Sequence, residues 1–125
     1  MASKFDLDER LIKFAGIVIK IAQSLPSNFA GNHLASQLIR SGTSPALNYA
    51  EALAAESRAD FIHKMKIGLK ELRETYTCLR IIQQQNWFKE DKLPVIINEN
   101  SQLIAIFVKS IETAKINKVT AYTKK

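Results

Sequence analysis

Apolar residues recur every three or four positions through four long stretches of this chain, which is the spacing of one face of an α-helix. The clearest stretch holds Ile62, Met65, Leu69, Leu72, Tyr76 and Leu79. Turn-forming residues are scarce, because the 125 residues include only 4 Gly and 3 Pro. Long helical periods with few turns favour an all-α fold and argue against a β-sandwich, which needs many turns.

The pattern predicts helices over residues 7–25, 29–56, 58–85 and 93–118. Short connections make consecutive helices antiparallel, so we expect an up-down-up-down four-helix bundle that forms a single domain over residues 1–125. Pro45 interrupts the second range, where it removes one helical hydrogen bond and crowds the carbonyl of Ser41. Either the helix continues through Pro45 with a kink, which we favour, or Ser44 caps a new helix there.

Composition places the chain among globular proteins. Hydrophobic residues make up 46% and charged residues 24%, which is ordinary for a soluble domain and argues against disorder. The single cysteine, Cys78, excludes an intramolecular disulfide and a cysteine-based zinc site, and suits the reducing cytoplasm. The most apolar stretch, residues 14–22, contains Lys20 and is too short to span a bilayer. We expect a cytoplasmic protein without a membrane partner.

A polar stripe borders the apolar face of the second predicted helix. It consists of Ser41, Ser44, Asn48 and Glu51, which fall within an arc of roughly 80°. The third helix carries a matching stripe that includes Lys64, Glu71 and Glu74. If the stripes face each other, Asn48 and Glu51 bond Lys64 directly or reach the carboxylates through water. We interpret these residues as a structural network that fixes the register of two antiparallel helices.

The same carboxylates raise the alternative of a metal site. Di-iron bundles use two Glu and two Glu-x-x-His pairs. Here neither His33 nor His63 stands three residues after a Glu, so the ligand set is incomplete. The chain also lacks a Gly-x-Ser-x-Gly elbow and a glycine-rich phosphate loop. The sequence therefore predicts no enzymatic activity, no metal and no cofactor.

Positive charge is concentrated in the second half of the chain. The net charge is +6, yet residues 1–57 hold equal numbers of basic and acidic side chains. Four cations share an arc of roughly 80° on the third helix, namely Lys66, Lys70, Arg73 and Arg80. A second basic cluster includes Lys109, Lys115 and Lys118. One interpretation is a solvated face, with lysines near helix ends that interact favourably with the helix dipole. The other is a surface that binds nucleic-acid phosphates. No aromatic residue interleaves the four α-helical cations, so base stacking is not expected there.

Apolar residues exceed what one bundle needs for its core. The first helix has a second apolar seam of Ile12, Ala15, Ile19 and Ala22, and the second helix has Leu47, Ala50 and Ala54 outside its main face. Contiguous exposed apolar surface usually marks an interface. We therefore expect a homo-oligomer.

Four spaced motifs cover the central half of the chain. They are Gln37-Leu38-Ile39-Arg40-Ser41-Gly42-Thr43-Ser44, Asn48-Tyr49-Ala50-Glu51-Ala52, Ser57-x-x-Asp60-Phe61-Ile62-His63-Lys64 and Leu69-Lys70-Glu71-x-x-Glu74-Thr75. In order and spacing the series resembles the 23S rRNA intervening-sequence protein family, also called four-helix bundle proteins. The chain departs from that family at Pro45, where a branched aliphatic is usual, and at Thr77-Cys78, where Tyr-Trp is frequent.

The resemblance implies a small bacterial protein that forms an up-down bundle, assembles into a homopentameric ring and has no established enzymatic activity. The family is similar to the accessory protein of diversity-generating retroelements, a basic pentamer that works with a reverse transcriptase and nucleic acid. We therefore expect a non-enzymatic ring that binds RNA or DNA, or a nucleic-acid enzyme such as a reverse transcriptase, through its basic residues. The alternative is a protein-only scaffold whose charge serves solubility.

Overall fold

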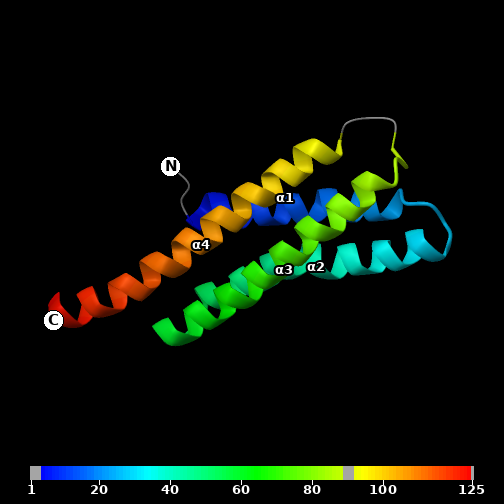
Figure 1. The fold of residues 1–125 in the computed structure, drawn as a ribbon. Coiled ribbons are helices and arrows are strands. Elements are labelled where there is room, and N and C mark those ends of the chain that lie inside the picture. The colour runs from blue at the N-terminus through cyan, green and yellow to red at the C-terminus, as the bar shows by residue number, and fades with distance from the viewer. Residues whose placement is uncertain (1–3, 89–91, 125) are drawn as a thin grey trace.

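The computed structural model describes the backbone of residues 4–88 and 92–124, and the side chains of residues 7–88 and 92–116. These parts of the chain form the α-helices α1 (Lys4–Gln23), α2 (Phe29–Leu53), α3 (Arg58–Gln84) and α4 (Leu93–Lys124), with no strand among them. Consecutive helices run antiparallel (Figure 1). This arrangement confirms the predicted all-α, four-helix fold.

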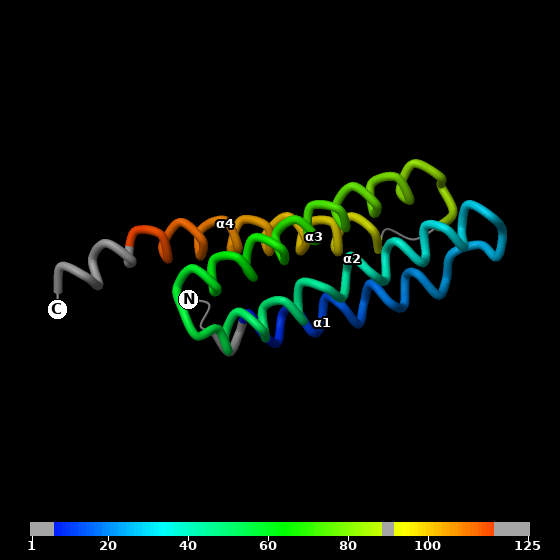
Figure 2. The backbone as a smooth tube through the Cα atoms, turned by 90° about the horizontal axis from the view of Figure 1, so that it is seen from below, coloured from blue at the N-terminus to red at the C-terminus, as the bar shows by residue number. Residues whose placement is uncertain are grey.

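Each helix packs most closely against its neighbours in sequence, whereas α1 and α4 contact each other more lightly. The turned view shows α1 and α2 together on one side of the molecule and α3 and α4 on the other (Figure 2). No helix in the described ranges combines the length and the apolar character that a membrane crossing requires.

Side-chain caps fix where α2 and α3 begin. The Asn28 side-chain oxygen accepts a hydrogen bond from the N–H of Gly31 at 2.8 Å. The Ser57 hydroxyl oxygen accepts one from the N–H of Asp60 at 3.0 Å. Each cap satisfies a backbone donor that has no partner within the helix.

The helix ends differ from the predicted ranges by a few residues. The first helix stops before residue 25 because the N–H and the hydroxyl of Ser24 both bond the carbonyl of Ile21, at 3.0 and 2.8 Å. The second stops before residue 56 because the chain must extend at Ser57, with φ −140° and ψ 159°, to cap α3. The last helix continues past residue 118, since residues 95–125 contain no Gly or Pro to end it.

The second helix runs without interruption through Pro45. Of the two sequence-based alternatives, the continuous helix is confirmed, and Ser44 lies inside it rather than capping a new one. The Pro45 ring is buried in the bundle. Burial of its apolar surface offsets part of the free energy lost with the missing backbone hydrogen bond.

The core consists of one apolar face from every helix. Its fully buried large side chains are Leu11, Phe14 and Val18 of α1, Leu38 of α2, Met65, Leu72, Leu79 and Ile82 of α3, and Leu103 and Phe107 of α4. Burying one such side chain contributes roughly 1.5–3 kcal/mol. Two glycines allow the helices to approach, because a Cβ at Gly42 would lie 2.5 Å from Val18 Cγ1 and one at Gly68 would lie 2.7 Å from Phe107 Cε2.

Polar contacts join α4 to its two neighbours. Asn100 is fully buried, and its side-chain amide donates to the carbonyl of Leu72 on α3 at 3.1 Å. Its side-chain oxygen has no hydrogen-bond partner within the described residues. Arg10 of α1 donates to both carboxylate oxygens of Glu99, at 3.0 and 2.7 Å, and this hydrogen bonding raises the pKa of Arg10.

Part of the apolar surplus remains on the surface of α1 and α2. Ile12 is 53% exposed and Leu47 is 64% exposed, while Ala50 and Ala54 are also exposed. The prediction was wrong for Ala22, which is 4% exposed and belongs to the core. Ala15 and Ile19 are half-buried, so the uncovered part of the predicted surplus consists of Ile12, Leu47, Ala50 and Ala54.

Candidate functional site

A groove of about 750 Å³ lies between α2 and α3. From α2 it is lined by His33, Leu34, Gln37 and Ser41, and from α3 by Lys66, Leu69, Lys70, Arg73, Glu74, Thr77, Cys78 and Ile81. Both sets recur every three or four residues, so each helix presents one face to the groove. Three of the lining residues, Ser41, Thr77 and Cys78, have small side chains.

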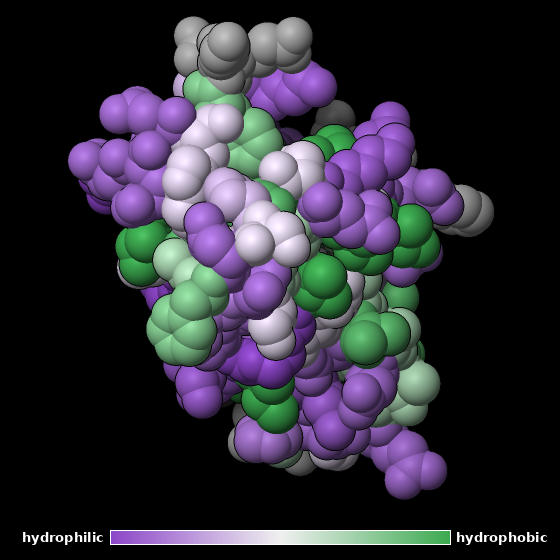
Figure 3. All heavy atoms as spheres, turned by 90° about the vertical axis from the view of Figure 1, so that its right-hand side faces the viewer, coloured by the Kyte–Doolittle hydropathy of each residue, from purple (hydrophilic) through white to green (hydrophobic). Residues whose placement is uncertain are grey.

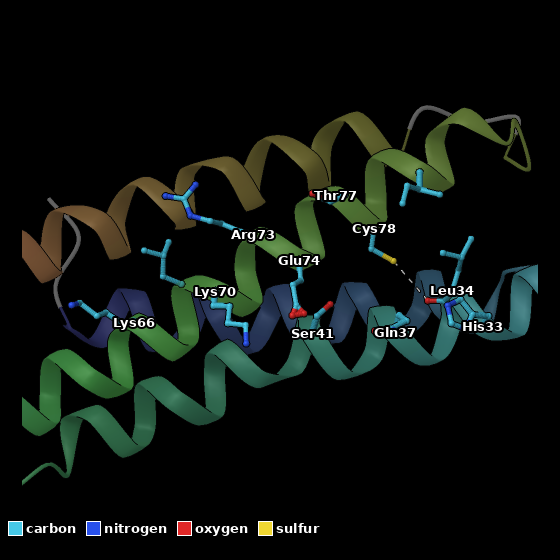
Figure 4. Close-up of a pocket in the computed structure, with 12 residues that line it drawn as sticks. His33, Leu34, Gln37, Ser41, Lys66, Lys70, Arg73, Glu74, Thr77 and Cys78 are labelled. Atoms are coloured by element: carbon cyan, nitrogen blue, oxygen red, sulfur yellow. Dashed lines mark hydrogen bonds between the residues drawn. The ribbon is translucent and has the colours of Figure 1, made fainter.

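The cations of the groove gather towards one of its ends. Lys66, Lys70 and Arg73 follow one another along α3, with Glu74 and Ser41 beyond them and Cys78 and His33 further along (Figure 4). The three cations are exposed, as predicted. We call them the basic row.

Arg80, the fourth predicted cation of α3, is exposed but is not among the groove-lining residues. Its guanidinium carbon lies 5.9 Å from the centre of the Tyr76 ring, within the range of a cation–π contact. The structure therefore brings together three of the four predicted α3 cations in one groove.

The predicted cations of α4 lie apart from this groove. Lys109 and Lys115 are exposed on α4 and do not line it. The side chain of Lys118 lies outside the described residues.

Ion pairs join the polar stripes of α2 and α3 at two levels. Lys64 Nζ lies 2.9 Å from a carboxylate oxygen of Glu51, and this hydrogen bond raises the pKa of Lys64. Arg40 reaches Glu71 at 3.4 Å and Glu74 at 3.5 Å. The acidic groups of the stripe are thus matched by cations on the facing helix.

A buried hydroxyl pair lies within the same interface. Thr75 Oγ1 is hydrogen bonded to the carbonyl of Glu71 at 2.8 Å and to Ser41 Oγ at 3.0 Å. Ser41 and Thr75 are almost completely buried, so this contact joins α2 to α3 where water does not compete.

Asn48 differs from its predicted role. Its amide donates to the carbonyl and the hydroxyl of Ser44, at 3.0 and 2.9 Å, and both of these hydrogen bonds lie within α2. Arg40, which is not part of the predicted stripe, is the side chain of α2 that crosses to Glu71 and Glu74. With about 100° of turn per residue, Arg40 lies roughly 20° from Glu51 around the helix, so it borders the polar stripe, and this angle was the available signal.

Cys78 is a buried thiol on the wall of the groove. Burial raises the pKa of Cys78, and its Sγ lies 3.9 Å from the carbonyl of Leu34. A thiol held in its protonated form is a poor nucleophile. Within the described residues, His, Cys, Asp and Glu side chains do not form a group of three or more that could hold a metal ion.

A family model and a solved structure point to one family. A family model described as 23S rRNA-intervening sequence protein matches residues 4–109. The chain is also similar to a crystal structure from Bacteroides thetaiotaomicron, described as a protein with unknown function from the S23 ribosomal protein family. That similarity has a TM-score of 0.75 and 27% identity, and covers 87% of this chain and 97% of the other. A comparison with curated proteins found no match.

Proposed function

Because the chain belongs to the 23S rRNA-intervening sequence protein family, we propose that it is a non-enzymatic bundle that binds RNA or DNA through the basic row of the α2–α3 groove. The observation that carries this proposal is that the three cations of the basic row have no carboxylate partner in the part of the chain that the structure describes. Arg40 and Lys64, the cations of the adjoining polar stripes, pair with carboxylates, whereas Lys66, Lys70 and Arg73 line one groove and form no ion pair within the described residues. They remain available for phosphate oxygens.

The local charge balance supports the same proposal. Glu74 is the one acid among the described residues that line the groove, and Arg40 holds one of its oxygens at 3.5 Å. Along the helix axis, Lys66 and Lys70 are about 6 Å apart and Lys70 and Arg73 about 4.5 Å apart. A row of this kind contacts successive phosphates and reads no sequence.

We further propose that the protein acts as a homo-oligomer in the cytoplasm, with five subunits as the family resemblance implies. The exposed Ile12 and Leu47 on the outer side of α1 and α2 support burial against a second copy. A closed ring repeats the basic row once per subunit, which increases the number of phosphates contacted. A nucleic-acid enzyme such as a reverse transcriptase would then be recruited to the same ring.

A second candidate function is a scaffold that binds only protein. It is favoured by the apolar part of the groove wall, where Leu34, Leu69 and Ile81 line the space. A partner helix would bury these side chains, whereas a phosphate backbone would not. Nuclease treatment separates the two proposals, because only a protein complex survives it.

Salt-dependent binding tests the nucleic-acid proposal. The double variant Lys70→Glu/Arg73→Glu removes two phosphate contacts and should reduce the slope of log affinity against log salt by about 1.8 for duplex DNA. The matched control is Lys13→Glu/Arg58→Glu, which makes the same change in net charge at exposed positions outside the groove. Native mass should be unchanged in both. Equal slopes for the two variants would show that only net charge matters, and the basic row would not be the binding site.

A further inference from the structure

A second pocket, of about 520 Å³, lies where α1 ends and α4 begins. Figure 3 looks at this end of the molecule and shows hydrophobic side chains in green set among hydrophilic ones in purple. The pocket is lined by Lys20 of α1, Leu93 of α4, and Trp87, Phe88 and Lys92 of the connection between α3 and α4, together with neighbouring residues. It shares no described lining residue with the α2–α3 groove.

The aromatic residues give the pocket a wall suited to a planar ligand. Trp87 and Phe88 are half-buried and pack against the core, so each ring is held in place on one side. A held ring loses little conformational freedom when a second ring stacks on it. Indole and phenyl rings are the surfaces on which proteins stack unpaired nucleobases.

Positive charge lies beside these rings. Lys20 is exposed in the last turn of α1, and Lys92 is exposed immediately before α4. The first turn of α4 carries no acidic residue, and the N-terminus of the helix contributes a partial positive charge. Glu90 and Asp91, which precede Lys92 in the chain, lie outside the described residues.

We propose that this pocket binds a nucleobase that carries a phosphate, with the base stacked on Trp87 and the phosphate beside Lys20 and the start of α4. The ligand is a free nucleoside monophosphate or one nucleotide of a single strand, because both offer an unstacked base joined to a phosphate. A duplex does not qualify, since its bases are stacked on one another. This site is additional to the phosphate row and adds the base contact that the row lacks.

Trp87 is the single tryptophan of the chain, so its fluorescence reports on this pocket directly. The nuclease-treated full chain is titrated with adenosine monophosphate, a six-nucleotide oligoadenylate, adenosine and inorganic phosphate. The nucleotide or the oligomer should quench the emission saturably, adenosine should bind more weakly, and phosphate alone should not quench. Quenching by the monophosphate identifies a free nucleotide as sufficient, and quenching by the oligomer alone identifies a strand.

Lys20→Gln should weaken this binding, while Lys13→Gln, at an exposed position of the same helix outside the pocket, should not. Trp87→Leu, followed by calorimetry, should lower affinity by about 5- to 150-fold, the range expected for one lost stacking contact. The absence of quenching by both nucleotide ligands would overturn the proposal, as would equal effects of the two lysine variants. In Lys70→Glu/Arg73→Glu the quenching should persist, so failure of the groove and failure of this pocket are distinguishable.

Discussion

Replacing Gly42 by alanine tests how tightly α1 and α2 are packed. The new Cβ would lie 2.5 Å from Val18 Cγ1 and 3.1 Å from Val18 Cβ and Cγ2. Val18 is fully buried, and its branched side chain has one strongly preferred rotamer in a helix. The clash is therefore relieved by moving α1 away from α2 rather than by rotating the valine.

The change in the free energy of unfolding for Gly42→Ala follows from two opposing effects. Overpacking of a core contact destabilises by about 1–3 kcal/mol. Alanine is a better helix former than glycine by about 1 kcal/mol, which offsets part of that loss. Gly42→Ala should thus lower the free energy of unfolding by about 1 kcal/mol, within a range of roughly 0–2.

Gly16→Ala is the matched control, because a Cβ at Gly16 meets nothing within 4 Å. It should stabilise the protein by about 0.5–1 kcal/mol. Urea unfolding of both variants at one protomer concentration measures the difference and keeps any oligomer linkage constant. If Gly42→Ala stabilises as much as Gly16→Ala, the close approach of α1 and α2 is refuted.

Two further predictions concern the α2–α3 interface. Arg40→Ala should destabilise the protein by about 1–2 kcal/mol, because it leaves the buried carboxylate of Glu71 without its cation. Adding Glu71→Gln should recover most of this loss. A double variant that is less stable than Arg40→Ala alone would contradict the pairing. Burial raises the pKa of Cys78 above that of an unfolded thiol, so the unfolded chain ionises first and stability should fall as pH rises through and above the unfolded value of about 8.5, as measured by thermal unfolding. Cys78→Ala should show a shallower decline, and an unchanged decline would exclude the thiol as its source.

The candidate site was only partly predictable from sequence. The helical period placed Lys66, Lys70 and Arg73 on one exposed face, and the structure has them there. The groove beside them depends on the distance between α2 and α3, which periodicity does not contain. The same limit explains why Asn48 was expected to reach α3 and Arg40 was not. Both lie near one helical face, and only the crossing geometry decides which side chain reaches α3.

The Trp87 pocket shows that helical periodicity does not predict sites that include residues between the helices. Lys20 and Trp87 are far apart in sequence, and nothing in either local pattern relates them. They meet because α1 ends where the α3–α4 connection turns, which is a consequence of helix lengths and antiparallel order.

Local spacing was enough to predict the four helices, their order and the core face of α3, because these depend on a repeat of three or four residues and on the burial of one face per helix. Tertiary structure alone decided where helix surfaces stay apart and which polar groups meet across them. These outcomes depend on side-chain volumes at the contacts, such as Gly42 against Val18, where one added methyl group would lie only 2.5 Å from Val18 Cγ1.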